Sequence, residues 1–230
     1  MSGLEKLQQW LLYTPNGRYT LRNERLFYHN SVQNVFGYYS LQIGLPEINF
    51  LQGNKIPTHF VLGHDVLCDL KFLPFANNSI DLIVCPHVLE FTSNYNHFLQ
   101  ECYRVLIPRG KLIISSFSQD SFFCNWNQKS YGFKINPINL ETLKNQLSEL
   151  NFNIDGGKFY GYRPPINNAK ILSRLGWMDK AGDRWFPTYA NNFGLTATKD
   201  VITPTPITPF TPTYAPGLTP NLGTAKICKK

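Results

Sequence analysis

The sequence lacks the features that would make it a membrane-spanning, disulfide-stabilised or zinc-binding protein. None of its hydrophobic runs approaches the roughly 20 residues that a bilayer-spanning helix needs. Its five cysteines are scattered, and no two of them are spaced as C-x-x-C, which is typical of reduced thiols. The histidines and cysteines also match no usual zinc pattern. We therefore expect no transmembrane segment, no disulfide framework and no metal.

The N-terminal residues, MSGLEKLQQWLLY, do not have the pattern of a secretory signal. Glu5 and Lys6 precede a short apolar run, and the run is followed by no small-residue cleavage site. We therefore expect a cytoplasmic protein without a membrane partner.

Length and composition favour one sizeable folded domain followed by a tail. The 230 residues are 43% hydrophobic and 16% charged, which is the balance of a globular chain. From Val201 onward, proline recurs at nearly every third or fourth position and removes the amide donors that helices and inner strands need. The sequence predicts a folded domain over residues 1–200 and a Pro/Thr-rich, disordered tail over residues 201–230.

The net charge is +7, and most of the excess positive charge lies after residue 120. A basic surface suits an anionic partner such as RNA or membrane headgroups. However, the sequence carries no recognition motif for RNA or DNA. We therefore interpret the charge as a solvated basic surface, and we do not expect a nucleic-acid partner.

Hydrophobic periodicity predicts a mixed α/β domain with a largely parallel sheet and an antiparallel edge strand. Asp155-Gly156-Gly157 is a turn signal that predicts a hairpin or a bent strand pair. Apolar residues recur at helical spacing in five segments, 4–11, 20–36, 95–106, 140–150 and 168–175. Short apolar runs predict strands at 40–44, 58–62, 80–85, 111–117 and 193–199.

One block of about fifty residues carries the most specific signal, and it resembles a known family. It reads Asp69, then Leu73-Pro74-Phe75, then the strand IDLIVC, then His87-Val88-Leu89-Glu90, and finally RVLIPRG at 104–110. In order and spacing the block resembles the class I S-adenosylmethionine-dependent methyltransferases of the small-molecule (methyltransferase type 11) branch. The segments PHVLEF, YRPP and GDRWFP further resemble the YafS-like proteobacterial group, over nearly all of residues 1–200.

The resemblance implies a Rossmann-like class I methyltransferase fold with S-adenosyl-L-methionine as the cofactor. In such folds, ligands bind outside the carboxyl ends of parallel strands. By resemblance, Gly44 lies beside the methionine and ribose, Asp65 is the nearest candidate for the acidic residue after the second strand, Asp69 and Leu70 lie near the adenine, and Pro86 faces the methyl group.

His87 follows the third predicted strand and is the best candidate for a catalytic general base, because imidazole titrates near neutrality. The alternative is a structural histidine that is bonded to a neighbouring backbone group. Methyl transfer can also proceed through alignment of the reactants alone, so a base is not required.

The segment after the first strand departs from the family pattern. Methyltransferases of this class normally carry G-x-G-x-G there, but this sequence reads IGLPEINFLQG and retains only Gly44. Pro46 removes an amide donor, and about fourteen residues before the next strand leave little room for a crossover helix. Two hypotheses follow: a methyltransferase acting on an unidentified small or moderately sized acceptor, or a catalytically inactive methyltransferase fold that serves as a binding or scaffold protein.

Overall fold

The computed structural model describes residues 3–63, 65, 70–123 and 134–200. The tail predicted after Val201 and the predicted site residue Asp69 lie outside the described residues. No helix of the described part is long and apolar enough to cross a membrane.

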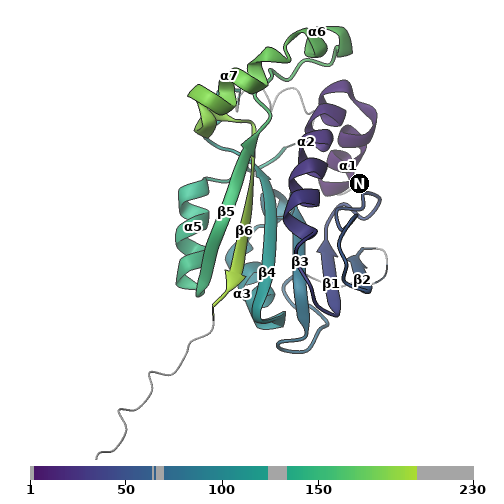
Figure 1. Cartoon of the computed structure of the whole chain (residues 1–230), viewed down its shortest axis with the longest axis vertical. Helices are drawn as coiled ribbons and strands as arrows, with labels where there is room; N and C mark the ends of the chain where they lie inside the picture. Colours follow the sequence, from purple (N-terminus) through teal and green to yellow (C-terminus); the bar gives the residue numbers. More distant parts are fainter. Residues whose placement is uncertain (1–2, 64, 66–69, 124–133, 201–230) are drawn as a thin grey trace, which may run out of the picture.

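A six-stranded mixed sheet in the order β2-β1-β3-β4-β6-β5 forms the centre of the fold (Figure 1). The first four strands along this order are parallel to one another, whereas β6 is antiparallel to both of its neighbours. The mostly parallel sheet with an antiparallel edge pairing is therefore confirmed. The strands are β1 (Tyr39–Ile43), β2 (Thr58–Leu62), β3 (Ile80–Pro86), β4 (Leu106–Phe117), β5 (Phe152–Tyr160) and β6 (Asn192–Lys199).

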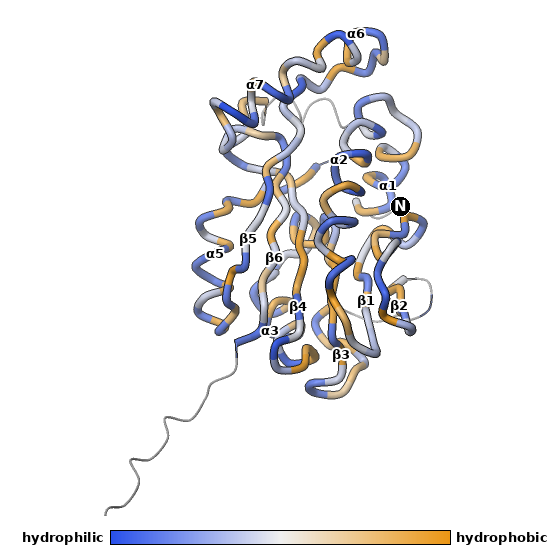
Figure 2. The backbone as a smooth tube through the Cα atoms, viewed as in Figure 1, coloured by the Kyte–Doolittle hydropathy of each residue, from blue (hydrophilic) through white to orange (hydrophobic). Residues whose placement is uncertain are grey.

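Helices cover both faces of the sheet because the central strands are apolar on both sides. In β3, Leu82 and Val84 pack with the N-terminal helices, whereas Ile83 and Cys85 pack with helices on the opposite face. Figure 2 shows hydrophobic residues gathered in these strands. The helices are α1 (Gly3–Tyr13) and α2 (Pro15–Val32) on one face, α3 (Tyr95–Val105) and α5 (Leu140–Glu149) on the other, and α6 (Ala169–Arg174) and α7 (Trp177–Trp185) beyond the end of β5.

Helix α2 begins five residues earlier than the periodicity predicted. Thr14 caps it by accepting a hydrogen bond from the backbone N–H of Gly17 at 3.0 Å, and Pro15 occupies the first turn, where its missing N–H costs nothing. Gly17 is required here because a Cβ would lie 2.0 Å from the Trp10 carbonyl oxygen. The close crossing of α1 and α2 therefore depends on this glycine.

The connection between β1 and β2 contains no helix, as its length predicted. The buried amide of Gln42 organises it instead. Its Nε2 donates to the carbonyl oxygens of Gly44 (3.2 Å), Leu45 (3.2 Å) and Ile48 (2.7 Å), and its Oε1 accepts from the Phe50 N–H at 2.9 Å. One side chain thus satisfies backbone groups that a helix would have satisfied internally.

The C-terminal part differs from the sequence predictions in two respects. The predicted hairpin or bent strand pair at Asp155-Gly156-Gly157 is wrong, because β5 runs through these residues as one strand with a register shift between Ile154 and Gly156. The Asp155 side chain is held at this bulge by Thr198, whose Oγ1 donates to it at 2.6 Å. Helix α7 was not predicted, and Gly182 is its only buried residue.

Candidate functional site

A cavity of about 360 Å³ lies at the carboxyl ends of β1 and β2, where the parallel-sheet rule places ligands. Ile43 and Leu62 are the last residues of β1 and β2, Gly44 and Gly63 directly follow these strands, and Val88 lies two residues after β3. This volume falls within the range of small-molecule sites, about 300–1,000 Å³. The remaining lining residues are Leu4, Glu5 and Gln8 of α1, together with Pro46 and Leu70.

Two glycines allow the backbone to line this cavity closely. Gly44 has φ of +89°, and a Cβ there would lie 2.8 Å from Val88 Cγ2 and 3.1 Å from the Pro86 carbonyl oxygen. Gly63 has φ of +93°, a backbone conformation that favours glycine. Space does not add to this requirement, since a Cβ there would make only ordinary contacts with Pro46. The sequence prediction identified Gly44 as a site residue but missed Gly63, although a glycine directly after a predicted strand is a usable signal.

The backbone beside the cavity is also strained at two non-glycine residues. Leu45 follows Gly44 with φ of 48°, and His87 follows β3 with φ of 54°. Conformations of this kind cost about 1–3 kcal/mol each and cluster at functional sites. Leu45 is fully buried, and its carbonyl oxygen accepts a hydrogen bond from Gln42 Nε2. These contacts stabilise the turn at the start of the crossover segment.

The predicted cofactor-binding residues divide into three groups. Gly44 and Leu70 line the cavity. The carbonyl oxygen of Pro86 would lie 3.1 Å from a Cβ at Gly44, so Pro86 is next to the lining. The Asp65 carboxylate accepts a hydrogen bond from the Val61 N–H at 2.8 Å and is not among the lining residues. Asp69 lies outside the described residues, so its role stays a prediction.

A second cavity of about 440 Å³ adjoins the first, because Leu70 lines both. Its other walls come from the start of α3 and from the turn before it, including Phe91, His97 and Phe98.

His87 lies in a buried cluster of charged groups and is fully shielded from solvent. Its Nδ1 is 2.7 Å from Glu90 Oε1, and its Nε2 is 2.5 Å from Oε1 of Glu24 on α2. Burial lowers the pKa of His87, but the two carboxylates outweigh burial and raise this pKa to about 10. His87 is therefore an imidazolium at neutral pH.

Neighbouring groups also bind the two carboxylates of this cluster. The Phe117 N–H donates to Glu90 Oε1 at 2.8 Å, and the Tyr160 hydroxyl donates to Glu24 Oε1 at 3.4 Å. The cluster thus joins α2, the end of β3, β4 and β5. Since both ring nitrogens of His87 face carboxylates, the geometry favours the structural interpretation of this residue, and the general-base role stays a prediction.

Comparisons with known proteins agree with this fold. Residues 49–114 match a family model described as a methyltransferase domain. YafS of Escherichia coli is 36% identical over 94 residues, which are 39% of each chain. The ubiquinone/menaquinone biosynthesis C-methyltransferase UbiE of Cereibacter sphaeroides is 32% identical over 74 residues, which are 32% of this chain and 30% of that protein.

A similar arrangement is found among solved structures. A SAM-dependent methyltransferase from Archaeoglobus fulgidus superposes with a TM-score of 0.58 at 17% identity, covering 79% of this chain and 94% of that one. The chain spans about half or less of the length of these curated relatives. The match covers 52% of an uncharacterized protein of Methanocaldococcus jannaschii, 39% of YafS and 30% of UbiE.

The sheet order, the cavity at its carboxyl edge and these matches define a Rossmann-like class I methyltransferase fold. Residues 49–114 carry the match to the methyltransferase-domain model, and a part of the chain is similar to YafS. The match with YafS covers less of the chain than the sequence motifs predicted, so the wider extent of that resemblance stays a prediction.

Proposed function

We propose that this protein is an S-adenosyl-L-methionine-dependent methyltransferase that acts on an unidentified small or moderately sized acceptor in the cytoplasm. One observation carries the proposal: a cavity lies at the carboxyl ends of β1 and β2, and it is lined by Gly44, where a Cβ would lie 2.8 Å from Val88, another lining residue. The family of the relatives supports the same activity.

The residues that line the cavity suit a ligand with this chemistry. Gly44 and Gly63 let a ligand approach the backbone, and Leu70 and Val88 offer apolar walls. Glu5 places a carboxylate and Gln8 an amide at the side formed by α1, which suits the cationic and polar parts of the cofactor. S-adenosyl-L-methionine, when bound, supplies an electrophilic methyl group on a sulfonium.

The contribution of the chain to such a reaction is alignment and exclusion of water. Helix α1 covers the cavity, and Gln42 and the His87 cluster hold the ends of β1 and β3 in the conformations that shape it. Fixed alignment of two reactants can supply a large part of a rate enhancement without a base. In this proposal His87 is a positioning residue.

Calorimetry with S-adenosylhomocysteine tests the proposal, with two alanine variants as a matched pair. Gly44→Ala introduces a Cβ 2.8 Å from Val88, whereas a Cβ at Gly156 on the far edge strand would contact nothing within 4 Å. We expect binding by the wild type and by Gly156→Ala, and a loss of about tenfold or more in Gly44→Ala, roughly 1.4 kcal/mol per tenfold. Absence of wild-type binding at millimolar ligand would contradict the proposal.

The alternative of a catalytically inactive binding or scaffold protein is favoured by two observations. The Asp65 carboxylate is engaged by the Val61 N–H rather than lining the cavity, and the sequence has no G-x-G-x-G loop. A methyl-donor assay with a panel of small acceptors separates the two candidates. Turnover would exclude the inactive protein, whereas S-adenosylhomocysteine binding without any turnover would favour it.

A further inference from the structure

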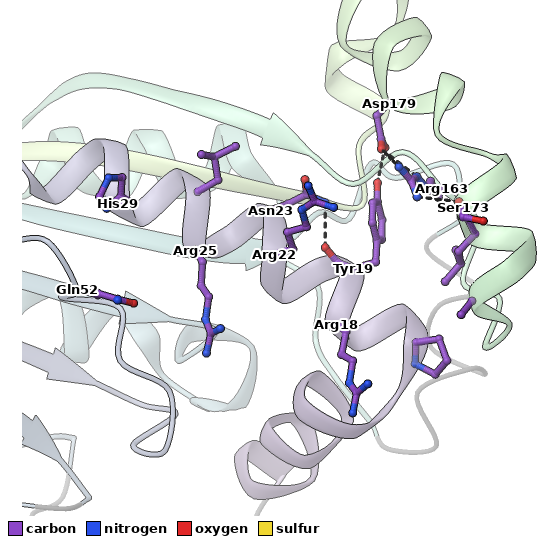
Figure 3. A pocket seen from close by; sticks show the side chains of 14 residues that line it. Arg18, Tyr19, Arg22, Asn23, Arg25, His29, Gln52, Arg163, Ser173 and Asp179 are labelled. Atoms are coloured by element: carbon purple, nitrogen blue, oxygen red, sulfur yellow. Dashed lines mark hydrogen bonds and ion pairs between the residues drawn. The ribbon is translucent and has the colours of Figure 1, made fainter.

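A large groove of about 960 Å³ lies on the outer side of α2, between this helix and the segment that carries α6 and α7 (Figure 3). It shares no lining residue with the candidate cofactor cavity. Five of its lining residues can carry positive charge, and only one is a carboxylate. They are Arg18, Arg22, Arg25, His29 and Arg163, with Asp179 as the acid.

Four of the basic residues form a stripe along α2. Arg18, Arg22, Arg25 and His29 are spaced four, three and four residues apart, so that about one lies on each helical turn of 5.4 Å. All four are exposed. Figure 3 shows Arg163 and Ser173 beside the end of the helix that carries Tyr19, whereas Arg25 and His29 lie farther along it, toward Gln52.

The single carboxylate of the groove is already neutralised by its neighbours. Asp179 accepts hydrogen bonds from the Tyr19 hydroxyl and from Arg163 Nε at 2.9 Å, and Arg163 Nη2 lies 2.7 Å from it. Burial and the adjacent Asp179 raise the pKa of Tyr19, so its hydroxyl remains a donor. This cluster fixes one wall of the groove and leaves its remaining charge positive.

The arginines of the stripe retain free donors. Arg18 donates from Nε to the Leu12 carbonyl oxygen at 2.9 Å, which leaves its terminal nitrogens available. Among the residues that the structure describes, no carboxylate lies within ion-pair distance of Arg22 or Arg25. Guanidinium groups without a carboxylate partner are well suited to bidentate contacts with phosphate oxygens.

We propose that this groove binds a small, multiply phosphorylated molecule. Its volume is at the upper end of small-molecule sites, about 1,000 Å³. Leu26 and Leu172 supply apolar surface for an organic part, and Asn23 and Ser173 supply hydrogen-bonding groups. A concave site between two elements fits a compact ligand better than the flat surface of a membrane.

Binding of inorganic tripolyphosphate, measured by calorimetry at about 50 mM salt, tests the proposal without requiring methyl transfer. The double variant Arg22→Gln/Arg25→Gln should lose about tenfold in affinity. The control is Lys144→Gln/Lys158→Gln, which removes the same charge from exposed residues beside α5 and β5. It should lose less than about twofold, because these lysines lie away from the groove.

Three results would overturn this proposal. The first is no binding of tripolyphosphate to the wild type at low salt, and the second is an equal loss in both double variants. The third is a single-stranded oligonucleotide that binds more than about tenfold more tightly than tripolyphosphate with the same dependence on Arg22 and Arg25, which would indicate a nucleic-acid strand instead. S-adenosylhomocysteine binding, measured in parallel, reports on the other cavity and should be unchanged in both variants.

Discussion

The two sides of α2 carry charge in opposite ways. On the buried side, Glu24 pairs with His87 in a cluster that is closed to solvent. On the exposed side, Arg22 and Arg25 flank the same residue in sequence and have no carboxylate partner among the described residues. On α2, the buried charge of Glu24 is therefore used to join elements, whereas the exposed charges of Arg22 and Arg25 are available to a ligand.

The largest expected effect comes from breaking the buried side. His87→Gln leaves Glu24 and Glu90 as two buried carboxylates without their cation, which should lower the free energy of unfolding by about 3–5 kcal/mol. Glu24→Gln leaves His87 paired with Glu90, so the pair has no net charge and the loss of unfolding free energy should be smaller. Urea denaturation measures both, with His29→Gln on the exposed side as the control. Equal stability of His87→Gln and the wild type would contradict the role assigned to this cluster.

The same cluster predicts a pH dependence of stability. The pKa of His87 is raised from an unfolded value of about 6.5 to about 10, so its stabilisation is fully present below pH 6.5 and is lost as the pH rises through 10. The difference in unfolding free energy between the wild type and His87→Gln should therefore shrink between about pH 7 and pH 10. A difference that stays constant over this range would show that His87 is neutral in the folded protein.

An intermediate effect is expected at Gln42, the buried amide that organises the crossover between β1 and β2. Gln42→Leu preserves volume but removes the partner of the Phe50 N–H and of the Leu45 and Ile48 carbonyl oxygens. Unsatisfied buried groups of this kind cost about 1–3 kcal/mol. The exposed Gln100 on α3 provides the control, since Gln100→Leu should change stability by less than about 0.5 kcal/mol. Similar losses in the two variants would contradict the organising role of Gln42.

The smallest effect on stability belongs to the exposed side of α2. Arg22→Gln should leave the thermal midpoint nearly unchanged, because the residue is exposed and unpaired, while tripolyphosphate binding falls. Thermal unfolding and calorimetry of the same variant sharpen the contrast with His87→Gln. A large loss of stability in Arg22→Gln would contradict the difference in structural role that is assigned to the exposed and buried sides of α2.

Much of the fold could be predicted because its signals are local. The apolar run of β3 and the helical spacing of α3 identify a parallel crossover. The absence of a helix between β1 and β2 follows from the short length of that connection. The bulge in β5 could not be predicted from Asp155-Gly156-Gly157, since the same residues suit a turn and the choice depends on pairing with β6.

The candidate site could be predicted only in part. Gly44 and Leu70 follow from motif positions, but the partners of His87 could not, because Glu24 comes from a helix far away in the sequence. The arginine stripe is visible in the sequence as spacing along one helix. Its significance depends on α6 and α7, which form the other wall of the groove.

The most direct test of the proposed function is a crystal structure of the protein soaked or co-crystallised with S-adenosylhomocysteine at millimolar concentration. We expect the ligand in the cavity between Gly44 and Gly63, in contact with Leu70 and Val88. A ligand bound elsewhere, or a cavity filled by the protein's own Pro46 segment, would contradict the assignment of this cavity as the cofactor site.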